Sequence, residues 1–359
     1  MATRHEFSFT GSSKDYFGIW IVNLFLSVLT IGIYTAWAKV RYLRYFYGNT
    51  HLDGHSFDYH ARPVQILIGR IIVVVAIGVL QLVNFVAPAV LWLGPVILLA
   101  YLTALPWIIN KAIAFNARMT SYRNVRFNFR GSYWKAFGIF LLMPVAVGLT
   151  AGLLLPFMSR MRVRYIANNL RYGTEPFRFQ APIGPFYGNL GSSVLFYIVA
   201  GVGLAVVGLV LGTVANVTGL IGALNPDLAR VSAGQAMNLS LAMSAVSAFY
   251  LTSVLVVFFY TSGVRNIAYN HTALGEEVQL LSSLSRWRYT WIIASNFLAT
   301  IATIGMARPW AMIRHWRYLA ANTALDGPES LAQFVDVRAD AGPAAAAEYL
   351  DIGGIDFGL

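Results

Sequence analysis

The chain has 359 residues, of which 57% are hydrophobic and only 11% are charged, and its formal net charge is +11. Roughly a quarter of the residues in a soluble domain are charged, so this composition excludes a soluble protein and indicates a helical integral membrane protein. The absence of cysteine excludes disulfides, thiolate catalysis and cysteine-based metal sites.

Six short segments alternate between apolar and polar residues, as strands do. They are residues 6–10, 56–60, 126–130, 176–180, 277–282 and 331–337. Isolated strands are marginally stable, so we expect these segments to pair on the cytoplasmic face as a small sheet or barrel.

Two pairs of long apolar segments are typical of transmembrane hairpins. The pairs are Ile66–Val86 with Leu91–Ile113 and Val194–Val217 with Leu239–Thr261. Gly208 and Gly212 in the second hairpin, and Gly148 and Gly152 elsewhere, have the small-xxx-small spacing that lets helices approach closely.

One stretch organises the chain. An apolar run, called an a-segment below, is followed by a Thr-x-Gly break and then by alternating aromatic and basic residues. The stretch occurs three times, and ungapped matches of this kind indicate internal repeats. The expected organisation is one membrane domain, residues 1–327, made of repeats 5–124, 125–277 and a partial repeat 278–327, followed by an acidic, partly flexible tail, residues 328–359.

The a-segments leave two topologies open. They are Tyr16–Tyr34, Ala136–Leu155 and Tyr289–Met306. If all three span the membrane, the chain crosses seven times and many basic residues violate the positive-inside rule. If each dips in and returns, the chain crosses four times and nearly all basic residues are cytoplasmic. We favour the re-entrant topology, because residues 17–30 would form a helix of only about 21 Å.

The expected fold class is therefore an all-α integral membrane protein. It is a pseudo-repeat helical bundle with re-entrant or spanning a-segments, two transmembrane hairpins and a small cytoplasmic β-sheet of short strands. Glycine permits chain reversals that other residues resist. The candidate re-entrant turn residues are Thr30, Gly32, Thr150, Gly152, Thr303 and Gly305.

Basic residues follow each turn, interleaved with aromatic ones. The candidate residues for binding a lipid headgroup or another anion are Lys39, Arg41, Arg44, Arg160, Arg162, Arg164, Arg308, Arg314 and Arg317. Generic anchoring in the headgroup zone would explain them. A sharper hypothesis is that the three helices together form one basic site for an anionic lipid headgroup or a phosphorylated solute.

Polar residues inside apolar segments are costly, so they are functional candidates. The candidates are Asn23, Asn296, Gln81 and Asn84. Hydrogen bonding between helices is the plainer role for Asn23 and Asn296. No Asp or Glu lies deep in an expected span, which disfavours a proton-coupled transporter.

The segment from His51 to His60 holds three histidines and two aspartates, but the equivalent residues of the second copy could not bind a metal. We interpret it as a polar loop and strand, and expect no metal. No hydrolase, phosphate-loop or dinucleotide motif is present either. We therefore expect no catalytic residues, no enzyme activity and no cofactor.

The phrase from Gly32 to Tyr45, followed by Asn49-Thr50 and Phe57-Asp-Tyr-His60, resembles the YjgN-like family of bacterial inner-membrane proteins, whose function is unknown. The resemblance covers residues 5 to 327 and leaves out the acidic tail. It implies a multi-pass inner-membrane protein and supplies no catalytic residues. Ala36 departs from the motif, where a proline is expected.

The favoured interpretation is a non-enzymatic, multi-pass protein of the bacterial inner membrane with both termini in the cytoplasm. Its basic cytoplasmic face would bind anionic lipid, or a protein partner through the C-terminal tail, and no nucleic acid. The alternative is a transporter or channel with a path between the re-entrant segments and the hairpins. An enzyme acting on a lipid is the third possibility.

Overall fold

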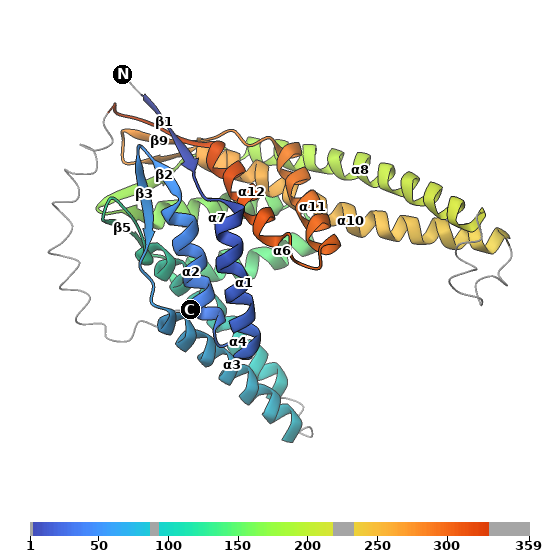
Figure 1. The fold of residues 1–359 in the computed structure, drawn as a ribbon, viewed down its shortest axis with the longest axis horizontal. Coiled ribbons are helices and arrows are strands. Elements are labelled where there is room, and N and C mark those ends of the chain that lie inside the picture. The colour runs from blue at the N-terminus through green and yellow to red at the C-terminus, as the bar shows by residue number, and fades with distance from the viewer. Residues whose placement is uncertain (1–2, 87–92, 218–232, 330–359) are drawn as a thin grey trace.

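The computed structural model describes residues 3–86, 93–217 and 233–329, and at its centre ten antiparallel strands close into a barrel (Figure 1). The strands follow one another around the barrel in chain order, and β1 completes it by pairing with both β2 and β10. The strands are β1 (Thr3–Phe9), β2 (Thr50–Leu52), β3 (His55–Tyr59), β4 (Thr120–Tyr122), β5 (Val125–Phe129), β6 (Leu170–Tyr172), β7 (Glu175–Phe179), β8 (Thr272–Leu274), β9 (Val278–Ser282) and β10 (Thr323–Gly327). Closure removes the unpaired edges that would otherwise invite aggregation.

Helices occupy every second connection, so the described chain forms five strand–helix–helix–strand units. Three units carry short helical hairpins: α1 (Ser13–Leu29) with α2 (Thr35–Gly48), then α5 (Tyr133–Phe137), η1 (Gly138–Leu142) and α6 (Met143–Leu149) with α7 (Leu155–Asn169), and α11 (Arg286–Ala302) with α12 (Arg308–Ala321). Two units carry long hairpins: α3 (Pro63–Val86) with α4 (Leu93–Met119), and α8 (Gly184–Val217) with α10 (Ala233–Asn270). All five hairpins leave the barrel from the same end, here called the mouth, because the remaining connections are tight turns at the opposite end (Figure 1).

The same backbone hydrogen bond closes the foot of every hairpin. In the first unit the amide of Thr10 donates to the carbonyl of Asn49 at 3.0 Å. The matching bonds, 2.8 to 3.1 Å long, join His60 to Met119, Arg130 to Asn169, Gln180 to His271 and Ser283 to Asn322. These bonds hold the two helices of each hairpin together at the barrel mouth.

The expected all-α fold class is wrong, because a closed barrel, and not a minor sheet, forms the centre of the protein. Five of the six alternating segments do contain strands, namely β1, β3, β5, β7 and β9, while residues 331–337 lie outside the described residues. The other strands escaped the sequence pattern for a physical reason. Four of them, β2, β4, β6 and β8, have only three residues each and closely follow a helix. Three residues are too few to display an alternation of apolar and polar side chains.

The barrel interior follows from the period of two along each strand, which turns alternate side chains inward. Five cross-strand pairs, one in each unit, face one another. They are Phe7–Leu52, Phe57–Tyr122, Phe127–Tyr172, Phe177–Leu274 and Leu280–Leu325. All ten side chains belong to one apolar cluster. Burial of this face fixes the register, because a slip of one residue would turn every pair outward.

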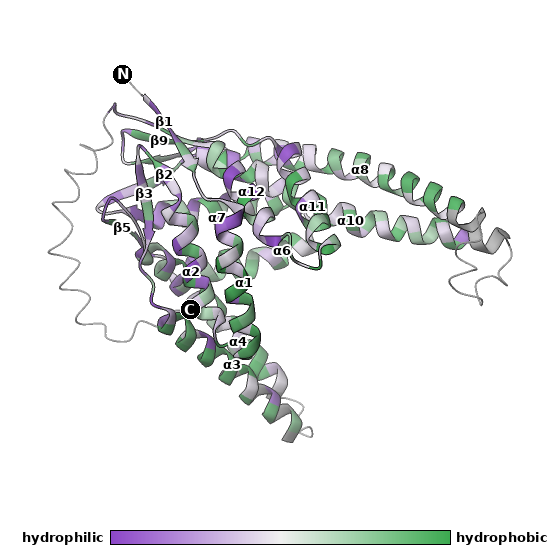
Figure 2. Ribbon diagram, in the orientation of Figure 1, coloured by the Kyte–Doolittle hydropathy of each residue, from purple (hydrophilic) through white to green (hydrophobic). Residues whose placement is uncertain are grey.

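The described residues contain three helices long and apolar enough to cross a membrane: Gly94–Met119 in α4, Gly184–Val214 in α8 and Asn238–Asn270 in α10. The other expected span, in α3, holds a shorter apolar stretch, Pro63–Val79. Within the described residues the candidate spans therefore number three, where we expected four or seven. Apolar residues cover the long hairpins along most of their length, whereas the barrel end is more hydrophilic (Figure 2).

Glycines on α8 let the second long hairpin close tightly. A Cβ added to Gly208 would lie 2.8 Å from the Cβ of Ser244, and one on Gly212 would lie 3.0 Å from the Cβ of Ser240. The packing role expected for this spacing is confirmed. Gly148 has no neighbour within 4 Å, so the same spacing near the second turn does not mark a helix contact.

Candidate functional site: an arginine collar at the barrel mouth

The tips of the three short hairpins share one turn geometry, built by the threonine of Thr-x-Gly. The hydroxyl of Thr30 donates to the carbonyl of Leu26 at 2.7 Å and accepts the amide of Tyr34 at 2.9 Å. Thr150 and Thr303 make the same two bonds, to the residues four before and four after. The glycines at these tips, Gly32, Gly152 and Gly305, have φ angles of 87°, 89° and 90°. Only glycine adopts such angles without strain, so the turn requires it.

The residue between the threonine and the glycine is held outward. Ile31 and Ile304 are each 95% exposed and have φ angles of 51° and 49°. A β-branched residue is rarely found in the left-handed region. At the second tip the neighbouring Leu149 is 84% exposed. Each tip therefore presents bare apolar side chains at the point farthest from the barrel.

The second helix of each short hairpin runs back to the barrel and carries the nine predicted basic residues, here called the arginine collar. Three of these arginines donate to backbone carbonyls near the strand ends. Arg44 donates to the carbonyls of Tyr59 and Ala61, each at 3.2 Å, Arg160 to Ala181 at 2.8 Å, and Arg317 to Gly11 at 3.0 Å. These arginines brace the hairpins on the barrel.

Two more collar arginines meet the predicted intramembrane asparagines. Nη1 of Arg314 on α12 donates to Oδ1 of Asn296 on α11 at 3.0 Å, and Nδ2 of Asn296 donates to the carbonyl of Ala311 at 2.9 Å. In the first hairpin Nη1 of Arg41 lies 3.5 Å from Oδ1 of Asn23. Asn23 and Asn296 are buried, so both tie the two helices of a hairpin together. The structure thus joins residues that the sequence assigned to two separate roles.

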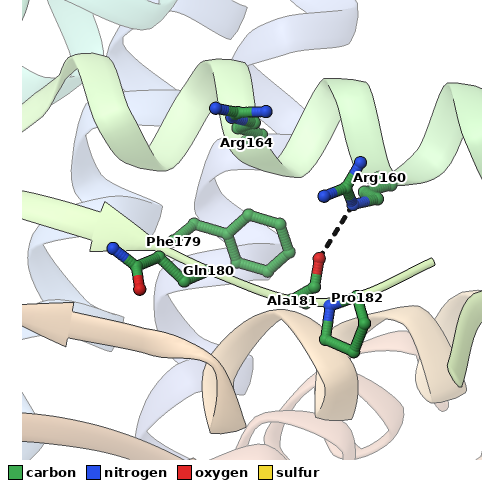
Figure 3. A pocket seen from close by; sticks show the side chains of 6 residues that line it. All are labelled: Arg160, Arg164, Phe179, Gln180, Ala181 and Pro182. Carbon is green, nitrogen blue, oxygen red and sulfur yellow. Dashed lines mark hydrogen bonds between the residues drawn. The ribbon is translucent and has the colours of Figure 1, made fainter. Parts of the chain in front are cut away.

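The remaining collar residues are Lys39, Arg162, Arg164 and Arg308. The three arginines are exposed, and the described part of the chain gives them no carboxylate partner. Arg164 and Arg160 lie one turn apart on α7 and line a hollow of about 330 Å³ with residues 179–182 (Figure 3). Burial, reinforced by the charge of Arg70, lowers the pKa of Lys39. Some collar residues therefore hold the hairpins in place, and the others form an exposed positive surface.

The other polar candidates lie on α3. Gln81 is exposed along the helix, and the side chain of Asn84 is outside what the structure describes. Neither is joined to the collar by a hydrogen bond among the described residues.

Sequence reasoning missed two arginines that the fold makes central. Nη1 of Arg286 at the start of α11 donates to Asn189 at 3.0 Å and to Ser192 at 2.6 Å, and so ties the last hairpin to α8. Arg265 near the end of α10 donates to the hydroxyls of Ser282 at 2.6 Å and Thr323 at 2.7 Å. Each is a basic residue at the end of a long apolar run, and that position was the available signal.

A cavity of about 710 Å³ opens the barrel interior toward the helices. All ten strands line it with inward-facing residues such as Phe7, Leu52 and Leu280. The second helix of each of the five hairpins lines it as well, through residues that include Tyr47, Ile113, Ile166, Tyr269 and Leu319. Arg265 is the one charged residue on the described lining.

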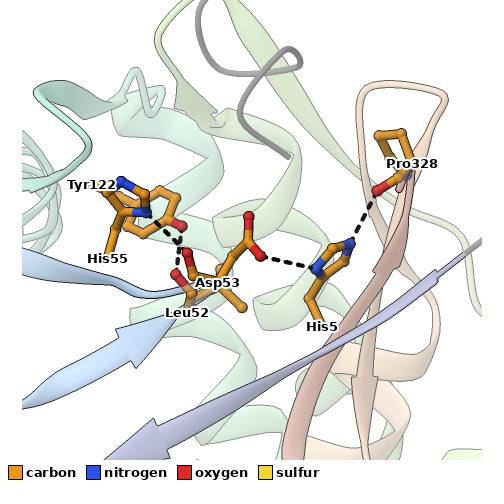
Figure 4. Close-up of polar contacts among 6 residues, drawn as sticks. All are labelled: His5, Leu52, Asp53, His55, Tyr122 and Pro328. Carbon is orange, nitrogen blue, oxygen red and sulfur yellow. Dashed lines mark hydrogen bonds and ion pairs between the residues drawn. The ribbon is translucent and has the colours of Figure 1, made fainter. Parts of the chain in front are cut away.

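The end of the barrel away from the mouth is closed by hydrogen bonds. The hydroxyl of Tyr122 donates to the carbonyl of Leu52 at 2.7 Å, and that of Tyr172 to the carbonyl of Tyr122 at 2.9 Å. Burial, with the charge of Asp53, raises the pKa of Tyr122 to about 12, which keeps this hydroxyl a neutral donor. Outside this closure His5 lies 3.6 Å from Asp53 and also contacts the carbonyl of Pro328 at 3.0 Å (Figure 4).

The residues from His51 to His60 do not converge on one point. Asp53 faces His5, the ring of His55 contacts the backbone of Asp53 at 2.9 Å, and His60 contacts Ser121 at 2.7 Å. The described residues contain no group of three or more His, Asp or Glu side chains placed to hold a metal ion.

Comparison with known proteins places this architecture in a family. Residues 4–352 match the model of the bacterial protein family of unknown function DUF898. The chain belongs to this family. It is 26% identical over 355 residues to the inner membrane protein YjgN of Salmonella typhimurium, covering 90% of this chain and 89% of the relative. It is 32% identical over 149 residues to the inner membrane protein YjgN of Escherichia coli O157:H7, covering 40% of this chain and 37% of the relative.

The predicted resemblance is confirmed, and the family match reaches well into the acidic tail that we had placed outside it. No solved structure matches the chain. The relatives are inner membrane proteins, and this DUF898 chain is a membrane protein with three candidate spans.

Proposed function

We propose that this protein binds anionic lipid headgroups at the cytoplasmic surface of the inner membrane through the free part of its arginine collar, without catalysing a reaction. The single observation that carries the proposal is the separation of charge. Arg162 and Arg164 are exposed along α7, and Arg308 is exposed at the start of α12 beside its tip, all without carboxylate partners among the described residues. The three helices that hold the whole collar, α2, α7 and α12, contain no acidic residue.

The acidic residues of the described chain lie elsewhere. Asp15 and Asp58 lie near the mouth and Glu329 follows β10, while the others are on the strands and the tight turns at the closed end, among them Glu6, Asp53, Glu175 and Glu276. An anionic surface would attract the mouth more strongly than the closed end, where acidic residues are interspersed with arginines of the strands and turns, so this asymmetry orients the molecule. The positive-inside rule then favours a cytoplasmic barrel and cytoplasmic termini.

The apolar surfaces support the same placement. The long hairpins extend from the mouth with exposed apolar side chains, and the bare tips at Ile31 and Ile304 lie on the hairpins that also carry the collar. α1 and α11 have 17 residues each, about 25 Å, which is less than the roughly 30 Å of hydrocarbon that a full crossing requires. The tips would therefore enter one leaflet, the collar residues nearer the barrel would lie at the headgroups, and the long side chain of Arg308 would extend from beside its tip toward them.

The test compares lipid preference in reconstituted vesicles. The variant Arg162→Gln/Arg164→Gln/Arg308→Gln removes the free cations, each of which contributes about 1 kcal/mol near an anionic surface. Arg126→Gln/Arg171→Gln/Arg178→Gln removes three exposed charges from the barrel wall and is the control, although Arg178 is paired with Glu276 at 3.4 Å. We expect the enrichment of phosphatidylglycerol around the protein, measured with a spin-labelled lipid, to fall for the collar variant only.

Equal enrichment for both variants would contradict the proposal. Solute flux through the same vesicles that depends on the collar arginines would favour the transporter instead.

A further inference from the structure

We propose that the barrel cavity holds an acyl chain of a membrane phospholipid, which enters through the mouth while its phosphate stays beside Arg265. This inference rests on the proposed function in one respect only, the placement of the mouth at the membrane surface. It assigns a second lipid site, inside the barrel, that is separate from the free arginines of the collar.

The size and chemistry of the cavity fit a chain and not a polar solute. Its volume of about 710 Å³ lies within the range of small-molecule sites. Eight strands give a barrel interior that side chains can fill or that holds one small ligand, and ten strands give a wider one. The five inward cross-strand pairs are aromatic or aliphatic throughout. This part of the lining gives a polar ligand little in exchange for its lost hydration, because the polar residues of the lining, such as Asn116, Thr323 and Arg265, lie toward the mouth.

The two ends of the cavity differ, and the difference sets a direction of entry. Tyr122 and Tyr172 close the far end with satisfied hydroxyls. At the mouth the lining passes to helix residues, among them Tyr47, Ile113 and Ile166, from hairpins whose outer parts are apolar and exposed. A chain that leaves the bilayer between these hairpins would pass the polar residues of the mouth, Arg265 among them, and then meet apolar surface inside the barrel.

Arg265 supplies the polar contact that an amphiphile needs and a hydrocarbon does not. Its guanidinium lies 4.2 Å from the centre of the Tyr269 ring and is fixed by the hydroxyls of Ser282 and Thr323. The described residues give it no carboxylate. A guanidinium has five N–H donors in a planar fork that suits phosphate. A phosphate at the mouth would neutralise this charge while the attached chain fills the cavity.

The experiment uses the full-length protein in vesicles that contain phosphatidylglycerol with a photoreactive diazirine at the end of its acyl chain. After irradiation, mass spectrometry locates the adducts. We expect adducts on inward residues of the barrel, such as Leu52 and Leu280, in addition to those on the long hairpins. Adducts confined to the hairpins and tips, with none in the barrel, would overturn the proposal. This outcome is measured on the unaltered protein and does not depend on any variant.

Neighbouring residues of one strand provide a matched pair of variants. Leu280 lines the cavity, and alternation places Leu281 on the outer face of β9. We expect Leu280→Trp to reduce the barrel adducts several-fold and Leu281→Trp to leave them unchanged. A reduction of equal size in both would overturn the assignment.

Arg265→Gln tests the phosphate contact without filling the cavity. We expect it to reduce barrel adducts from the phospholipid several-fold while those from a free fatty acid with the same diazirine change less. Barrel adducts from the fatty acid alone, in the unaltered protein, would overturn the phospholipid assignment.

The outcome is independent of the collar. If phosphatidylglycerol is enriched around the protein but no adducts form in the barrel, this inference is overturned and the proposed function stands. Barrel adducts without that enrichment would do the reverse.

Discussion

Arg314 and Asn296 form a hydrogen bond of 3.0 Å that joins the two helices of the last short hairpin. Because the amide of Asn296 also donates to the carbonyl of Ala311, this one side chain of α11 bonds two polar groups of α12. The first hairpin repeats the arrangement with Asn23 and Arg41. The matching positions of the middle hairpin hold Met143 and Met161, so an apolar pair occupies the same place there.

This comparison predicts strong coupling between Asn296 and Arg314. Asn296→Met alone removes one acceptor from the half-buried guanidinium of Arg314, which keeps its bond to Ser295 at 2.7 Å, and removes the side-chain donor to the carbonyl of Ala311. These losses should lower the free energy of unfolding by about 1–3 kcal/mol. The double variant Asn296→Met/Arg314→Met, which imitates the middle hairpin, should cost less than the sum of the two single changes. Denaturation in detergent measures all three, and strict additivity would show that the bond contributes nothing.

The contact between α8 and α10 gives a second prediction. Gly208→Leu places a side chain where even a Cβ would lie 2.8 Å from Ser244, and overpacking of this kind costs about 1–3 kcal/mol. Gly203→Leu is the control, because Gly203 lies on the same helix with no neighbour within 4 Å. We expect the thermal midpoint in detergent to fall for Gly208→Leu only. Equal falls would mean that the loss comes from the helix itself and not from the contact.

The sequence predicted the parts of this fold that leave a local pattern. Thr-x-Gly marks each tip because the turn needs a hydroxyl to bond both helix ends and a glycine with φ near 90°. Phe7 and Phe57 mark strands because they alternate with polar residues. Barrel closure leaves no such mark, since it depends on the pairing of Thr3 with Gly327, residues from opposite ends of the described chain.

The candidate site was predictable to a similar depth. The basic residues of the site were evident in the sequence, but which of them bond to the protein and which stay free was not. Whether an arginine is free, like Arg164, or bonded to a backbone carbonyl, like Arg44, depends on the strand end that the fold brings beside it. Arg265 is held at the cavity by the hydroxyls of Ser282 on β9 and Thr323 on β10. No spacing in the sequence could predict that these three residues meet.

His315 gives a prediction about pH. Burial on α12, with the positive charge of Arg265 as a smaller cause, lowers the pKa of this ring below its usual 6.5. A histidine of this kind stabilises the fold fully above pH 6.5, and the contribution is lost as the pH falls below that value, because the unfolded chain then binds the proton more readily. The thermal midpoint in detergent should therefore decrease as the pH is lowered from about 7.5 to about 5.5.

Part of that fall should disappear in His315→Gln, which cannot titrate. His55→Gln changes an exposed histidine at the start of β3 and serves as the control. If both variants keep the full dependence on pH, another group is responsible for it.

The depth of the hairpin tips gives the final prediction, and the absence of cysteine makes it clean to test. Ile304 is 95% exposed at a tip that the proposed placement puts inside one leaflet, whereas Ser283 is exposed at the foot of the same hairpin. Ile304→Cys should resist a membrane-impermeant maleimide added to either side of the membrane. Ser283→Cys should react only from the cytoplasmic side. Reaction of Ile304→Cys from outside the cell would show that the hairpin reaches across the membrane. Reaction of both variants at equal rates from the cytoplasm would show that the tip does not enter the membrane. Both side chains are exposed in the protein, so only burial of the tip in hydrocarbon would protect Ile304→Cys from the reagent.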